Sequence, residues 1–135
     1  MKRIPRISAL MTAFPWHLPS DTPVREARLF MQEHKIRHLP VTDDQHRLVG
    51  VVTLDDLPAS GEQFLAQCVA PAVVVDALER ADQVLIEMAE RHLPLVVLTH
   101  RHRLAGIFTR ADACRQFAAW LREPFLPPDS GDDVA

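Results

Sequence analysis

The sequence predicts a mixed α+β fold, α/β-like in its alternation, built from two copies of one unit that fold together. The first observation is an internal repeat: HRLVGVVTLDD (46–56) returns as HRLAGIFTRAD (102–112), 56 positions later. The second is the pattern around each copy, which indicates a helix, two strands and a further helix. The third is size. A unit of about 55 residues is short for a core of its own, so the copies are expected to share an interface.

The composition is that of an ordinary globular protein and narrows the function only by exclusion. The net charge of −3 disfavours a nucleic-acid partner, which normally meets a basic face. No apolar run approaches the roughly 18 residues of a membrane span, and the basic first residues lack the apolar run of a signal peptide. A cytoplasmic protein without a membrane partner is therefore expected. Cys68 and Cys114 are expected to be buried small apolar residues rather than a disulfide or metal ligands.

The first expected repeat covers residues 7–58 and opens on an apolar lead-in. Residues 8–12 suit one helical turn. AFPWHLP (13–19) carries two prolines, which remove backbone donors, so an extended loop is expected there. Its large apolar side chains either plug the edge of the core or border a ligand: Phe14, Trp16 and Leu18.

A helix and two strands follow in the first repeat. Asp21 or Thr22 suits the N-cap and Pro23 the first helical position, and apolar residues at helical spacing continue to Lys35. The other expected elements are strands at 39–42 and 48–53, and a short helix capped by Asp55 or Asp56 and limited by Pro58.

The second expected repeat covers 63–122, after a linker at 59–62. Asp76 with Glu79 resembles a capping box. The expected elements are a helical lead-in at 64–68, a β-branched stretch at 70–75, a helix at 77–91, strands at 93–99 and 104–109, and a final helix at 112–122. That last helix carries an apolar stripe that serves either self-packing or a dimer face: Cys114, Phe117, Trp120 and Leu121. Residues 123–135 are expected to form a disordered acidic tail.

The register of the second hairpin allows two interpretations. His-Leu-Pro at 38–40 recurs at 92–94, an offset of 54 rather than 56. Either the second hairpin is two residues longer, or Leu93-Pro94 is an accidental echo and Val96 takes the place of Pro40.

Each copy ends in a constellation with a chemical meaning, G-h-h-T-x-x-D. Glycine permits close backbone approach, and a carboxylate can accept hydrogen bonds from both hydroxyls of a ribose. A ligand's phosphates could use helix N-termini and nearby cations, with Arg37, His38, Arg110 and either Arg101 or Arg103 as candidates. The competing interpretation is structural, because Thr-x-x-Asp also ends a strand and caps a helix. The residues concerned are Gly50, Thr53, Asp56, Gly106, Thr109 and Asp112.

The full order of motifs resembles a tandem pair of cystathionine-β-synthase (CBS) domains, also called a Bateman module. In the first copy the resemblance rests on Met11-Thr12, SDTPVREARLFMQEHKIRHLPV and RLVGVVTLDDL. In the second it rests on DALERADQVLIEMAERHLPLVV and RLAGIFTRADACR, without a Met-Thr lead-in. It implies a β-α-β-β-α fold per repeat and two sheets packed about a pseudo-twofold axis, with two clefts between them.

The same resemblance implies a ligand and its contacts. Such modules bind AMP, ADP, ATP or S-adenosylmethionine and need no further cofactor. They often form dimers and signal to a partner, so a homodimer and an unidentified effector protein are expected. The implied ribose contacts are Thr53, Asp56, Thr109 and Asp112, and weaker base or phosphate candidates are Phe14, Trp16, His17, Arg37, His38, Pro40, Val73, His92 and Arg110.

Catalysis is not expected, because the sequence offers neither a nucleophile–base pair nor a glycine-rich phosphate loop. His100 and His102 could bind a transition metal, but no fixed third ligand accompanies them, so no metal site is expected. The alternative function is a protein-interaction or dimerisation scaffold with vestigial or empty clefts.

Overall fold

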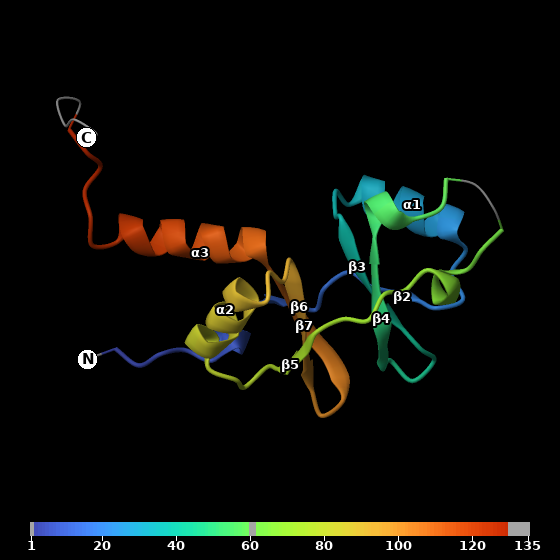
Figure 1. The fold of residues 1–135 in the computed structure, drawn as a ribbon, viewed down its shortest axis with the longest axis horizontal. Helices are drawn as coiled ribbons and strands as arrows, with labels where there is room; N and C mark the ends of the chain where they lie inside the picture. The colour runs from blue at the N-terminus through green and yellow to red at the C-terminus, as the bar shows by residue number, and fades with distance from the viewer. Residues whose placement is uncertain (1, 60–61, 130–135) are drawn as a thin grey trace.

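The computed structural model describes residues 2–59 and 62–129 as two small sheets with their helices, and confirms the predicted α+β fold (Figure 1). Repeat 1 contains β2 (Leu18–Pro19), α1 (Val24–Glu33), β3 (His38–Thr42), β4 (Leu48–Thr53) and the 3₁₀ turn η2 (Leu54–Asp56). Repeat 2 contains the 3₁₀ turn η3 (Leu65–Gln67), β5 (Val74–Asp76), α2 (Ala81–Glu90), β6 (Leu95–His100), β7 (Arg103–Thr109) and α3 (Arg110–Arg122). The 3₁₀ turn η1 (Ile7–Ala9) and β1 (Thr12–Ala13) form the lead-in of repeat 1.

The two lead-in segments cross between the repeats. The sheets have the orders β2-β3-β4 and β1-β7-β6-β5, so β1 joins the sheet of repeat 2, with Thr12 opposite Ile107. The lead-in of repeat 2 does the reverse, with Ala70 opposite Val51 in β4. This reciprocal exchange is what a pseudo-twofold arrangement requires. The extended loop predicted at 13–19 was therefore only partly right, because its two ends pair as strands with different sheets.

The repeated glycine is explained by this crossing. A Cβ added at Gly50 would lie 2.7 Å from the carbonyl oxygen of Ala70, and one at Gly106 would lie 2.9 Å from that of Thr12. Real Cβ atoms do not approach backbone oxygen so closely, so each glycine lets the other repeat's lead-in pass. The close approach inferred from the sequence is real, but the chain itself makes it.

Apolar packing binds the repeats together. Each repeat has its own cluster, centred on Met31 and Leu39 in repeat 1 and on Phe108 in repeat 2. A third cluster unites both sheets through Val51 and Ile107, with Leu95 and Val97 also buried in it. The shared interface expected from the short repeat length is therefore present.

Both interpretations of the second hairpin need correction. Pro40 lies opposite Val51 and Val97 lies opposite Ile107, so Val97, not Val96, takes the place of Pro40. The second hairpin is also not longer: its paired ends, Thr99 and Leu104, enclose 100–103, whereas 43–47 lie within the first. The echo at 92–94 is accidental. The residue with left-handed backbone after each helix is Lys35 (φ 56°) in one copy and His92 (φ 53°) in the other. His92 therefore corresponds to Lys35 and not to His38.

The predicted helix starts were early. Pro23 is extended (ψ 140°) and α1 begins at Val24 with no side-chain cap. Asp76 ends β5, and its carboxylate accepts from the amide of Leu78 (2.8 Å), so it forms a turn rather than a capping box. The short helix expected after β4 is only the turn η2.

α3 extends away from the two sheets, above α2 in Figure 1, and none of its residues is buried. Cys114 on this helix is exposed and Cys68 is only partly buried, which corrects the prediction that both are core residues. Of the expected tail, residues 123–129 are exposed, and 130–135 lie outside the described residues. Within the described ranges, no helix is long and apolar enough to cross a membrane.

Candidate functional site

A cleft of about 580 Å³ lies between the repeats, at the point where β7 passes into α3. We call it the Asp112 cleft. Repeat 2 supplies the strand end and first helical turns, repeat 1 supplies the segment between α1 and β3, and the lead-in after β1 supplies one wall. Its lining residues are Thr12, Pro15, Trp16, Lys35, Ile36, Arg37, His38, Pro40, Pro94, Ile107, Thr109, Arg110, Ala111, Asp112 and Arg115.

Thr109 and Asp112 form a reciprocal cap at the start of α3. The amide of Asp112 donates to Thr109 Oγ1 (3.1 Å), and the amide of Thr109 donates to Asp112 Oδ2 (2.9 Å). Arg115 donates to Asp112 Oδ1 (3.0 Å). The structural interpretation of Thr-x-x-Asp is thus correct for this copy. The cap and Arg115 leave acceptor positions on the Asp112 carboxylate, because its two oxygens offer about four in all.

Four cationic side chains line the cleft together with this one carboxylate: Lys35, Arg37, Arg110 and Arg115. Arg37 forms an exposed ion pair with Asp55, and Arg110 donates to the carbonyl oxygen of His92 (3.4 Å). Four cations against one carboxylate leave an excess of positive charge along the lining, and such an excess concentrates anions. The cleft therefore suits an anionic ligand.

Trp16 forms an aromatic wall of the cleft although its side chain stays 55% exposed. Its ring stacks on His34 with centroids 4.2 Å apart and meets Phe30 edge-on at 5.7 Å. Phe14 is 96% exposed, with φ 49°, and lies outside the lining. Of the three side chains predicted at the core edge, only Leu18 packs against the core of repeat 1. His17 also lies outside, with its Nδ1 3.0 Å from the carbonyl oxygen of Pro15.

His38 lies between the two repeated motifs. It lines the Asp112 cleft, and its Nδ1 is 3.3 Å from Thr53 Oγ1. Burial, reinforced by the positive charge of Arg37, lowers the pKa of His38 below its usual 6.5, against a smaller opposing effect of Asp55 and Asp56. The neutral imidazole is thus favoured in the folded protein.

The first copy of the motif, Thr53 with Asp56, has different surroundings. Neither residue lines the Asp112 cleft, and Thr53 caps no helix. The strand register identifies the residues that occupy the places of the four cations. Lys35 corresponds to His92, Arg37 to Pro94, Arg110 to Leu54 and Arg115 to Ala59.

Some predicted residues lie away from the cleft, and some lining residues were not predicted. Val73 packs against the core of repeat 2, and Arg101 and Arg103 lie at a hairpin tip, away from the cleft. The charged lining residues that the sequence did not single out are Lys35 and Arg115. Arg115 had a signal, since it stands three positions after Asp112 in a helix. Lys35 had none, because its place depends on a left-handed turn.

Among the described residues, no group of three or more His, Cys, Asp or Glu side chains is placed to hold a metal ion. His102 lies among arginines at the hairpin tips rather than in a cluster of ligands.

The comparisons with known proteins come from sequence and from structure. The CBS domain family profile matches residues 7–57 and 68–119. Hypoxic response protein 1 of Mycobacterium tuberculosis is 33% identical over 101 residues, 66% of this chain and 68% of that protein. L-aspartate semialdehyde sulfurtransferase of Methanocaldococcus jannaschii is 29% identical over 103 residues, 73% of this chain. The match spans only 20% of the sulfurtransferase.

Solved structures share the fold. AcuB of Vibrio cholerae superposes with a TM-score of 0.80 at 22% identity, over 93% of this chain and 100% of that one. CBSX2, solved in complex with AMP, gives 0.78 at 23% identity, over 88% and 99%. The CBS domain pair of protein MJ0100, solved with 5′-methylthioadenosine and S-adenosyl-L-methionine, gives 0.77 at 24% identity, over 87% and 99%.

Proposed function

This chain belongs to the CBS domain family, and on that premise we propose that it is a non-catalytic regulatory module that binds an adenine nucleotide or adenosyl compound in the Asp112 cleft. Two structural neighbours were solved with AMP or with S-adenosyl-L-methionine and 5′-methylthioadenosine. The observation that carries the proposal belongs to this chain. One cleft brings the Thr109–Asp112 pair together with an aromatic wall and four cations.

Each part of the cleft suits one part of a nucleotide. The carboxylate of Asp112 has acceptor positions left for the two ribose hydroxyls, although its helix cap and Arg115 already use others. Trp16, Ile36 and Pro40 give an apolar and aromatic surface for a base. Arginine forks match phosphate oxygens, which favours a phosphorylated ligand over an adenosyl sulfonium.

The signal is proposed to be a population shift between the repeats. The cleft is lined by both repeats, so a bound ligand stabilises one relative placement of the two sheets. The module is proposed to form a homodimer in the cytoplasm, and a separate effector protein is proposed to recognise that placement.

The test is a thermal-shift series with adenosine, AMP, ADP, ATP and S-adenosylmethionine. A ligand at about 100 times its Kd stabilises the folded state by about 2.7 kcal/mol, which raises Tm by several degrees. Asp112→Ala should abolish most of that rise, and Asp56→Ala should change it far less. Because Asp112→Ala also removes a helix cap, each rise is measured from the variant's own ligand-free Tm.

Asp112→Asn is the matched control for the cap. Its amide oxygen can still accept from the amide of Thr109, while the charge that ribose binding uses is lost. A nucleotide affinity that is unchanged in both Asp112 variants would contradict the ribose contact. No shift with any of the five compounds would contradict the ligand-binding proposal altogether.

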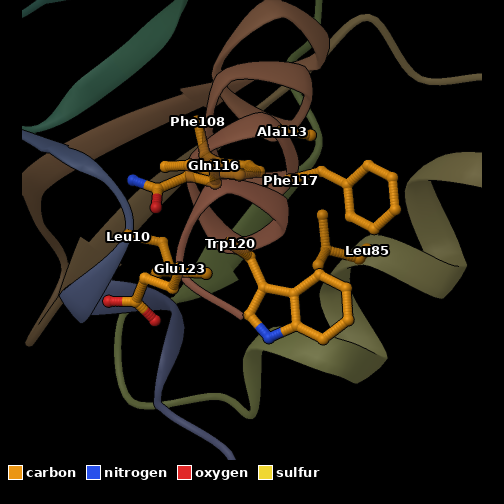
Figure 2. A pocket seen from close by; sticks show the side chains of 9 residues that line it. Leu10, Leu85, Phe108, Ala113, Gln116, Phe117, Trp120 and Glu123 are labelled. Carbon is orange, nitrogen blue, oxygen red and sulfur yellow. The ribbon is translucent and has the colours of Figure 1, made fainter. Parts of the chain in front are cut away.

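The scaffold alternative has one specific observation in its favour. α3 presents Phe117 (60% exposed) and Trp120 (53% exposed) over an apolar groove that Leu10 and Leu85 also line (Figure 2). Figure 2 shows the two aromatic rings and Leu85 on one side of the helix, toward α2. Exposed apolar patches of this kind mark interaction sites. This second function would be favoured if none of the five compounds raised Tm and if the protein formed a dimer that dissociated in Trp120→Glu.

A further inference from the structure

The repeated motif contains residues that the nucleotide site does not use. Both copies begin with His-Arg-Leu, and only the later Gly, Thr and Asp have been given a role. His46 and Arg47 lie at the tip of the first hairpin, and His102 and Arg103 lie at the tip of the second. In Figure 1 both hairpin tips point to the bottom of the view, on the same side of the molecule.

These tips enclose a cavity of their own. It measures about 460 Å³ and is open to solvent, and both repeats contribute to it equally. Its lining consists of Gln45, His46, Arg47, Arg101, His102 and Arg103. None of these six lining residues is acidic, in a chain whose net charge is −3. The loop 43–47 also holds Asp43 and Asp44, so the three arginines of the cavity exceed the acidic residues of this loop by one.

The cations at this cavity are largely unneutralised. Among the described contacts, Arg101 and Arg103 have neither an ion pair nor a side-chain hydrogen bond, and Arg47 has only a long ion pair with Asp43 (3.9 Å). The carboxylate of Asp43 is occupied by the amides of Gln45 (2.8 Å) and Arg47 (2.9 Å). Those backbone hydrogen bonds lower the pKa of Asp43, so it stays ionised but serves the turn.

The backbone at both tips is held in an uncommon conformation. His46, Arg101 and His102 have φ values of 62°, 52° and 65°. Turns with such angles ordinarily use glycine or asparagine, and strain of this kind concentrates at functional sites. Bulky side chains thus occupy positions where smaller residues would fit the turn more easily.

We propose that the hairpin tips form a second ligand site, which binds an anion carrying two linked phosphate groups. Guanidinium forks bind phosphate oxygens in pairs. Arg47 on one hairpin and Arg101 with Arg103 on the other provide two separate sets of donors. One anion that spans both sets joins the tips of the two repeats. This site is distinct from the Asp112 cleft, whose lining shares no residue with it.

The test is an NMR titration of the full chain with inorganic pyrophosphate at constant ionic strength, which follows the backbone amides of 43–47 and 100–103. These amides should shift in a saturable way. Arg101→Gln with Arg103→Gln should weaken binding at the tips roughly tenfold or more, the usual loss on removing charged hydrogen bonds. Both side chains are exposed, so the ligand-free spectrum and Tm report an intact fold.

Matched variants separate this site from the nucleotide cleft. Arg110→Gln with Arg115→Gln removes the same charge from the Asp112 cleft and should leave the pyrophosphate response of the tips unchanged. Adenosine, which has no phosphate, should move amides of the cleft and not those of the tips. If the cleft amides stay unchanged with adenosine, AMP, ADP, ATP and S-adenosylmethionine while the tip amides show a saturable response to pyrophosphate, the proposed function is contradicted and this site stands.

Three results would overturn the second site. The tip amides could fail to shift with pyrophosphate, or shift equally in the Arg101→Gln and Arg103→Gln double variant. Sulfate could bind the tips as tightly as pyrophosphate, which would remove the need for two linked groups. Binding of a duplex oligonucleotide without any binding of pyrophosphate would assign the arginines to a different partner.

Discussion

The two repeats carry the same Thr-x-x-Asp motif in different surroundings. The Asp112 copy lies at the start of a 13-residue helix, in a cleft with four cations. The Asp56 copy ends in a single 3₁₀ turn, and at the matching positions it has a histidine, a proline, a leucine and an alanine. Duplication preserved the residues that shape the strand end, while the charges that would select a phosphate diverged. A repeated motif thus shows a shared fold and does not by itself show two equal sites.

The difference extends to the hydroxyl of the threonine. Thr109 accepts from the amide of Asp112, within the cap of α3. Thr53 instead lies 3.3 Å from the ring of His38, and no helix depends on it. The same side chain is structural in one repeat and a neighbour of the cleft wall in the other.

The largest expected effect comes from the crossing of the lead-ins. Gly50→Ala would place a Cβ against the backbone oxygen of Ala70, which only a movement of the chain can relieve, so we expect a loss of about 2 kcal/mol. Gly106→Ala meets the side chain of Met11 first, at 2.4 Å, and then the oxygen of Thr12. Urea denaturation of both variants would measure the difference.

Met11→Ala provides the control for this pair. Added to Gly106→Ala, it removes the closest obstacle and should recover part of the lost stability. Added to Gly50→Ala, it touches the other crossing and should recover none. The two crossings would not differ as described if both glycine variants lost the same unfolding free energy and Met11→Ala restored it in neither.

A smaller effect should separate the two threonines. Thr109→Val removes the acceptor that caps α3 and should cost about 1 kcal/mol of unfolding free energy. Thr53→Val loses only its contact with His38 and should stay within roughly 0.5 kcal/mol of the parent. Urea midpoints give the comparison, and circular dichroism at 222 nm reports the helix. Equal losses at both positions would contradict the assignment of a cap to one copy alone.

The sequence predicted the repeated architecture well, because periodicity and turn chemistry are local signals. The strand at 48–53 was predicted with its observed bounds, and the glycine of each copy lies where the other repeat's lead-in crosses. Helix starts were less reliable. Asp76 looked like a cap and instead closes a turn, since its carboxylate is free to take the nearest amide, that of Leu78.

Long-range placement could not be read from the sequence. Lys35 reaches the Asp112 cleft only because β1 joins the other repeat's sheet and brings the two halves together. The crossing itself depends on the backbone pairs Thr12 with Ile107 and Ala70 with Val51, which leave no periodic pattern. Arg101 or Arg103 was a candidate for the nucleotide phosphates as a nearby cation, yet both lie at the far end of the hairpin.

The smallest expected effect is a pH dependence that belongs to repeat 1, because Leu95 stands where repeat 2 would have its counterpart of His38. Burial and Arg37 lower the folded pKa of His38, against the smaller pull of Asp55 and Asp56, so the unfolded chain binds the proton more readily. The resulting stability is present above the unfolded value of 6.5 and is lost as pH falls from there through the folded pKa.

Urea midpoints at pH 7.5, 6.5 and 5.5 should therefore fall more steeply for the parent than for His38→Gln. His100→Gln, at an exposed position, should follow the parent. Parallel profiles for the parent and His38→Gln would mean that the imidazole is not selectively neutral in the fold. The comparison between the repeats would then rest on the cations of the Asp112 cleft alone.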